Sequence, residues 1–145
     1  DEEGKYLVSY SYNAVTVYDT DTFSCICDKT IDESSMSLDN AIITGDWLVY
    51  LSITDKELVS ENERFSRINF VNIINDADSF ELDIDYLNLD SAIYDDGIIY
   101  LSLNNLMDSI LDNFSYVMAV DVNSKAVVWN TFGPQFSFSK QWLEG

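Results

Sequence analysis

The sequence predicts an all-β fold, and three observations carry that prediction. The 145 residues repeat one pattern several times, in which a polar or acidic turn precedes a short apolar run. These runs are rich in β-branched and aromatic residues, and clusters of Asp, Asn, Ser and Gly separate them, as is typical of strands joined by turns. Helical patterning is scarce: Asn104 to Asn113 places its apolar residues on one helical face, and Asp55 to Asn62 has a weaker helical pattern.

The first repeated element begins at a turn and runs through an apolar stretch to a serine. Gly45 to Ile53 lines up with Asp95 to Leu103, and both copies contain Tyr-Leu-Ser at a spacing of 50 residues. Glu2 to Tyr10 is a more distant copy near the N-terminus. Ile98 to Leu101 is short and apolar throughout, which predicts a strand that is covered on both faces.

Three further elements repeat along the chain. The second is an apolar run that enters an Asp or Asn and then a polar turn, and its copies are Val15 to Thr22, Ile68 to Asn75 and Val117 to Ser124. The third comprises Phe23 to Ile26, Phe80 to Ile84 and Ala126 to Trp129, and the fourth comprises Ser37 to Ile43 and Asn88 to Tyr94. We expect the repeated Asp19, Asn72 and Asp121 to be structural, because such side chains accept hydrogen bonds from turn amides.

Four short antiparallel strands that recur every 43 to 50 residues form the sequence pattern of a β-propeller blade. We therefore expect residues 1–145 to form a single propeller segment, with a partial blade at 5–31, blades at 37–85 and 88–131, and the start of a further strand at 134–145. A ring needs about four to eight blades. About three blades predict an incomplete ring, an arc of a larger propeller or one that closes with another chain; a β-sandwich is the alternative.

Two segments carry a resemblance to known propeller families. Ala119 to Trp129 is similar to the quinoprotein-type (PQQ-like) blade signature, which Ala119, Asp121 and Trp129 match, with Lys125 at the position of the turn glycine. Val15 to Ile26 resembles the third strand and turn of a WD40-type blade, with Tyr18-Asp19 in the place of Trp-Asp. We expect Trp129 to pack between blades.

The charge of the chain limits its partners. The sequence holds 26 acidic and 7 basic residues and no histidine, which gives a formal net charge of −19. Nucleic acid is excluded as a direct partner, because no basic surface is available to neutralise phosphates. Anionic membrane surfaces are disfavoured for the same reason, and the sequence has no apolar run long enough to span a membrane.

The sequence offers no constellation of catalytic residues. Without histidine, neither a Ser-His nor a Cys-His pair is possible, and no glycine-rich phosphate loop is present. Neither Asp19 to Asp21 nor Asn75 to Asp78 continues into a calcium-binding loop, so we expect no metal and no cofactor. Cys25 and Cys27 are expected to be reduced thiols on one face of a strand, in or beside the core, which favours an intracellular compartment.

Two insertions are the candidate partner-binding segments. Residues 54–67 and 104–115 occupy equivalent junctions between the first and second elements, so they are expected on the same face of the molecule. The first carries the basic residues Lys56, Arg64 and Arg67, and the second carries the apolar residues Leu106, Met107, Ile110 and Leu111. Long loops on a rigid scaffold are a common place for binding, although the apolar set is equally compatible with a local core.

These observations favour a non-catalytic scaffold over an enzyme. The expected partners are a protein that contacts the two insertions, or other subunits that complete the propeller. The alternative is a segment of a propeller enzyme, quinoprotein-like or hydrolytic, whose active residues lie outside these 145 residues.

Overall fold

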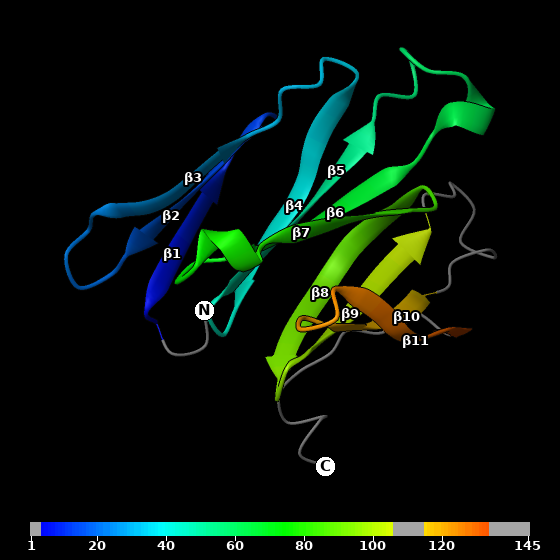
Figure 1. The fold of residues 1–145 in the computed structure, drawn as a ribbon. Coiled ribbons are helices and arrows are strands. Elements are labelled where there is room, and N and C mark those ends of the chain that lie inside the picture. The colour runs from blue at the N-terminus through cyan, green and yellow to red at the C-terminus, as the bar shows by residue number, and fades with distance from the viewer. Residues whose placement is uncertain (1–3, 106–114, 134–145) are drawn as a thin grey trace.

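A computed structural model describes residues 4–105 and 115–133, and within them the chain is all-β (Figure 1). The prediction of the fold class is confirmed at this level. Each sheet is antiparallel, and its strands are neighbours in chain order. The first sheet comprises β1 (Tyr6–Tyr10), β2 (Ala14–Asp19) and β3 (Cys25–Thr30). The second comprises β4 (Met36–Thr44), β5 (Trp47–Thr54), β6 (Ser66–Asn72) and β7 (Phe80–Ile84). The third comprises β8 (Leu87–Asp95), β9 (Ile98–Asn105), β10 (Ser115–Asp121) and β11 (Ala126–Gly133).

Helical structure in the described residues is limited to two single turns, η1 (Glu61–Glu63) and η2 (Asp76–Asp78). The expected helical segment at 55–62 is a turn at Asp55 followed by η1. Asn104 and Asn105, the first two residues of the other expected helix, belong to β9, and most of that segment lies outside the described residues.

The turn after the second element is built by the repeated Asp or Asn, as predicted. Oδ1 of Asp19 accepts hydrogen bonds from the backbone N–H groups of Asp21 and Thr22, at 2.8 and 3.1 Å. Oδ1 of Asn72 and of Asp121 accepts the same pair of bonds two and three residues further along the chain. These side chains are therefore used in holding a tight turn.

The three sheets stack face to face, and the second sheet is covered on both faces. One core cluster lies between the second and third sheets and includes Val49, Leu51 and Phe70. Another lies between the first and second sheets and includes Leu48 and Tyr50. Because side chains alternate along a strand, β5 contributes its odd-numbered residues to one cluster and its even-numbered residues to the other.

The structural repeat is 51 residues, one more than the spacing of the Tyr-Leu-Ser motif. The β4–β5 hairpin closes with Thr44 opposite Trp47, and the β8–β9 hairpin closes with Asp95 opposite Ile98. Tyr50 is therefore the structural equivalent of Leu101. The expected alignment was wrong by one residue, which in a strand moves every side chain to the opposite face.

Bulges at Asp39 and Asp90 interrupt the pairing of β4 with β5 and of β8 with β9 at equivalent positions. The Asp39 carboxylate accepts a hydrogen bond from the Leu89 backbone, and the Asn88 amide nitrogen, when oriented to donate, lies 3.2 Å from both of its oxygens. Nδ2 of Asn40 donates to the Leu89 carbonyl at 2.9 Å. The bulge in β4 of the second sheet is thus hydrogen-bonded to β8, the first strand of the third sheet.

The Asp39 bulge predicts a pH dependence of stability. Burial raises the pKa of Asp39, and the hydrogen bond from the Leu89 backbone only partly offsets this. The native state therefore binds the proton more tightly than the unfolded chain, so stability decreases as the pH rises through the raised pKa. We expect Asp39→Asn to be more stable than the wild type at pH 7, and the difference to vanish below the ordinary pKa of 3.8. Urea unfolding between pH 3 and pH 7 checks this, and a difference that grows on acidification would contradict it.

Bulges change the positions of two expected packing residues. Trp129 is 50% exposed on the edge strand β11, where Val128 has no partner on β10, so within the described residues no sheet covers it. Cys25 and Cys27 do not share a face, because Ile26 is an unpaired residue between them. Both cysteines are free thiols, Cys25 exposed and Cys27 half-buried against the core.

Candidate functional site

The first predicted insertion connects β5 to β6 and is acidic as a whole. The Asp55 side chain accepts a hydrogen bond from the Glu57 backbone at 2.9 Å and starts a turn. Nη2 of Arg64 donates to the Lys56 carbonyl at 3.1 Å, while its Nε is buried without a hydrogen-bond partner. The structure therefore brings Lys56 and Arg64 together. Residues 55–64 contain these two cations and four carboxylates, those of Asp55, Glu57, Glu61 and Glu63.

Arg67 belongs to a different environment from the other two basic residues. It lies on β6 opposite Asp83 of β7, and its Nε is 2.7 Å from the Asp83 carboxylate. Its Nη1 is 2.6 Å from the Glu33 carboxylate, and its Nε is 3.9 Å from that of Glu81. The bond to Asp83 is the main reason that the pKa of Arg67 is raised. Its charge is thus engaged within the protein, where it joins the β3–β4 connection to the second sheet.

The apolar residues of the second predicted insertion lie outside the described residues. They are Leu106, Met107, Ile110 and Leu111. Their place in a partner surface or in a local core remains a prediction.

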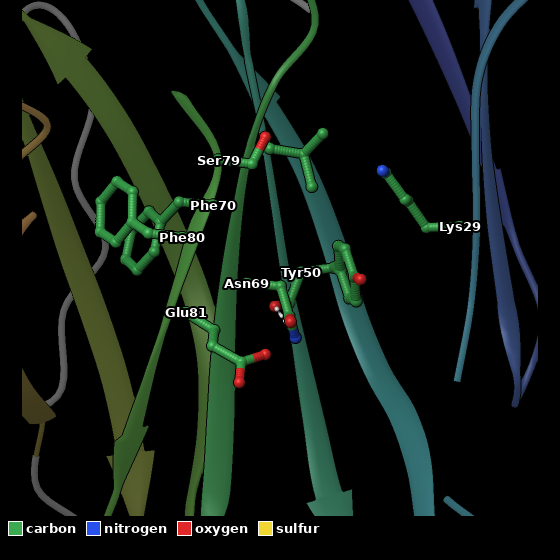
Figure 2. Close-up of a pocket in the computed structure, with 8 residues that line it drawn as sticks. Lys29, Tyr50, Asn69, Phe70, Ser79, Phe80 and Glu81 are labelled. Atoms are coloured by element: carbon green, nitrogen blue, oxygen red, sulfur yellow. Dashed lines mark hydrogen bonds between the residues drawn. The ribbon is translucent and has the colours of Figure 1, made fainter. Parts of the chain in front are cut away.

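The structure adds a groove of about 340 Å³ between the first and second sheets (Figure 2). Its polar walls come from Lys29 on β3, Tyr50 on β5, Asn69 on β6 and Glu81 on β7. Figure 2 shows the Tyr50 ring between Lys29 on one side and Asn69 on the other. The apolar lining residues are Phe70, Val71 and Phe80.

The strands that carry the groove are rigidly packed on their opposite face, toward the third sheet (Figure 2). The rings of Phe70 and Phe80 stack with their centroids 4.6 Å apart, and Trp47 meets Phe80 edge-on at 6.0 Å. Trp47 and Phe70 are buried in the core between the second and third sheets, and Phe80 packs against it from the edge strand β7. The main core thus lies behind the groove and fixes the strands from which Tyr50, Asn69 and Glu81 project.

Tyr50 is the most unusual residue of the groove. Only 7% of it is exposed, yet its hydroxyl makes no hydrogen bond to any residue in the described part of the chain. Burial, followed by the charges of the neighbouring Cys27, Glu81, Asp76 and Asp32, raises the pKa of Tyr50 to about 12. The phenol therefore stays protonated at neutral pH and has unused hydrogen-bonding capacity.

Asn69 and Lys29 differ in how far their polar groups are engaged. Nδ2 of Asn69 donates to the carbonyls of Tyr50 and Arg67 at 3.5 and 3.4 Å, but its Oδ1 accepts nothing from the described residues. Nζ of Lys29 lies 2.8 Å from the Asp76 carboxylate, and this bond lowers the pKa of Asp76. The ammonium of Lys29 is therefore largely neutralised.

The lining residues include one hydroxyl beside a carboxylate. The Ser79 hydroxyl donates a long hydrogen bond of 3.4 Å to Asp76, whose pKa is lowered by its bond to Lys29, so the carboxylate is a weak base. Burial raises the pKa of the nearby Cys27 thiol, which lowers its reactivity at neutral pH. Among the residues that the structure describes, no group of three or more Cys, Asp or Glu side chains is arranged to hold a metal ion. The groove is therefore a candidate binding site.

A second candidate surface is the outer face of the first sheet. Leu7 pairs with Tyr18, the residue that precedes the turn residue Asp19. Leu48 and Ile99 occupy the same position in the second and third sheets, since each pairs with the residue before Asn72 or Asp121. Leu48 and Ile99 are completely buried, whereas Leu7 is 56% exposed. Within the described residues the first sheet also has no counterpart of β4 and β8, so β1 pairs only with β2.

Comparisons with known proteins identify no relative: no family model and no curated protein matches the chain. The described residues contain no helix of the length and apolarity needed to cross a membrane.

Proposed function

We propose that the chain is a non-catalytic protein-interaction scaffold built from propeller-type blades. The exposure of Leu7 is the observation that carries this proposal, because the residues at the same position in the other two sheets are fully buried between sheets. A leucine that is removed from water contributes about 1.5–3 kcal/mol. The outer face of the first sheet is therefore a surface that would be stabilised by a further sheet.

The stacking supports blades rather than a sandwich. In a sandwich two sheets share one core, whereas the second sheet here contributes to a core on each of its faces. The strand order of every sheet follows the chain, as in a propeller blade. The first sheet then corresponds to the three outer strands of a blade whose innermost strand is still to be supplied.

The occupant that we propose for the outer face is a second copy of the chain. The sheets of this chain already pack against one another, as in the core between the first and second sheets, so a sheet of a second copy has a suitable surface. Two copies of three sheets make six, within the range of about four to eight that closes a propeller ring. Further protein partners would contact the insertions that carry Lys56, Arg64 and the apolar residues 106–111.

Light scattering over a range of concentrations tests this association. We expect the wild type to self-associate and Leu7→Glu to weaken the association by at least about tenfold, because a charge would replace buried apolar surface. Leu58→Glu is the matched control, since Leu58 is 63% exposed but lies in the 54–67 insertion. A wild type that stays monomeric, or two variants that behave alike, would overturn the proposal.

A further inference from the structure

On the inner wall of the groove, the unused hydrogen-bonding groups of Tyr50, Asn69 and Glu81 are mainly acceptors. Oη of Tyr50 and Oδ1 of Asn69 accept nothing from the described residues, and the Glu81 carboxylate meets only Arg67, at 3.9 Å. The spare donor of these three residues is the Tyr50 hydroxyl, and the ammonium of Lys29 at the rim is bound to Asp76. A ligand that matches this set must bring several donors and few acceptors.

The polarity of the groove is specific to this interface between sheets. Tyr50 pairs with Asn69 across β5 and β6, and the equivalent pair across β9 and β10 is Leu101 with Met118. Leu101 and Met118 are buried in the core between the second and third sheets. Apolar residues thus satisfy the packing at the equivalent positions, and the polar Tyr–Asn pair is particular to this interface.

The groups around the groove carry net negative charge. Two cations, Lys29 and Arg67, stand against the five carboxylates of Asp32, Glu33, Asp76, Glu81 and Asp83. The local balance is therefore 2 − 5 = −3, in a chain whose net charge is −19. An anionic ligand is disfavoured, and a cation is attracted.

We infer that the groove binds an arginine side chain presented by a basic protein partner, an inference that rests on the proposed scaffold function. A guanidinium has five N–H donors in a plane and no acceptor, which matches Tyr50 Oη, Asn69 Oδ1 and the Glu81 carboxylate. Its aliphatic stem would pack along Val71 and the Tyr50 ring, which face the groove. The volume of about 340 Å³ is at the lower end for ligand sites and suits one long side chain.

A lysine is a poorer match for the same groove. Its ammonium is a compact, strongly hydrated charge with three donors, and it cannot span separate acceptors in one plane as a guanidinium does. The chain already places its own Lys29 at the rim, where the ammonium pairs with Asp76 at 2.8 Å and leaves the three acceptors unused.

NMR titration of the whole chain with the peptide acetyl-Gly-Arg-Gly-amide tests the inference. We expect saturable shifts at the Asn69 side-chain amide and at residues of β3, β5, β6 and β7 that line the groove. The same peptide with citrulline, which has the shape of arginine without its charge, should bind at least about tenfold more weakly, and the lysine peptide should be weaker than the arginine peptide.

Three variants separate the groove from general electrostatic attraction. Tyr50→Phe removes one acceptor and keeps the ring, and since the hydroxyl has no partner among the described residues, the variant should fold as well as the wild type. Glu81→Gln removes one charge from the rim. Both should weaken binding of the arginine peptide by about fivefold to tenfold. Glu57→Gln removes the same charge from the exposed 54–67 insertion and should leave the affinity unchanged.

Three outcomes would overturn the inference: citrulline binding equal to arginine, shifts spread over the acidic surface, or unchanged affinity in both Tyr50→Phe and Glu81→Gln. The titration is repeated in the Leu7→Glu background, at a concentration where light scattering finds that variant monomeric. If the wild type does not self-associate but arginine binding persists in Leu7→Glu, the association through the first sheet is rejected and the groove is retained. Self-association without arginine binding would reject the groove alone.

Discussion

Phe70→Ala is expected to cost about 4 kcal/mol of unfolding free energy, the usual range for a fully buried phenylalanine being about 3–5 kcal/mol. Phe70 is completely buried, at the centre of the core between the second and third sheets. Its ring also stacks on Phe80, so the substitution leaves a cavity and removes packing that holds β7 in place. Domains of this size are stable by only about 5–15 kcal/mol. Urea unfolding followed by circular dichroism measures the loss as a lower midpoint with an unchanged slope.

Phe23→Ala is the matched control for this substitution. Phe23 is 78% exposed in the turn between β2 and β3, so the same change should alter the stability by less than about 0.5 kcal/mol. A loss below about 1 kcal/mol for Phe70→Ala would mean that the second and third sheets do not share the core described above.

The strands and their turns were predictable from the sequence, because local patterns encode them. Alternating and continuous apolar runs mark the strands, and Asp19, Asn72 and Asp121 mark the turns through hydrogen bonds to amides two and three residues away. Such interactions depend on neighbours in the chain, so one sequence is enough to recognise them.

The faces of the strands were not predictable in the same way. The match of Tyr50 with Tyr100 is off by one residue, because the hairpins fix the repeat at 51. Bulges at Ile26 and Val128 interrupt the alternation of side chains along β3 and β11, so the sequence pattern misplaces Cys27 and Trp129. A bulge depends on pairing between strands, which leaves little trace in a single strand.

The groove had a signal in the sequence, although it is visible only once the repeats are aligned at the correct spacing. Tyr50 and Asn69 replace the apolar Leu101 and Met118 of the third sheet, and a polar pair in a strand covered on both faces is the exception that points to a site. Lys29 joins them from another sheet, so its contribution required the tertiary structure.

Ser66→Ala is expected to cost about 2–3 kcal/mol, a large effect for the loss of one oxygen atom. The Ser66 hydroxyl donates to the Leu87 carbonyl at 2.7 Å and accepts from the Leu87 N–H at 2.9 Å, and both residues are buried. These two bonds tie the first strand of the third sheet to β6 of the second. Without the hydroxyl, the Leu87 N–H loses this buried partner, and such a group costs about 1–3 kcal/mol in addition to the lost bond.

Ser52→Ala is the comparison that isolates this mechanism. Ser52 is also buried, but its hydroxyl donates one long hydrogen bond, of 3.5 Å, to the Arg67 carbonyl within the same sheet. A bond of that length is weak, so the substitution should cost less than about 1 kcal/mol. Hydrogen exchange gives a further readout: Ser66→Ala should speed exchange at the start of β8, whereas Ser52→Ala should not. Equal costs in the two variants would show that burial of a serine, and not the reciprocal pair with Leu87, sets the effect.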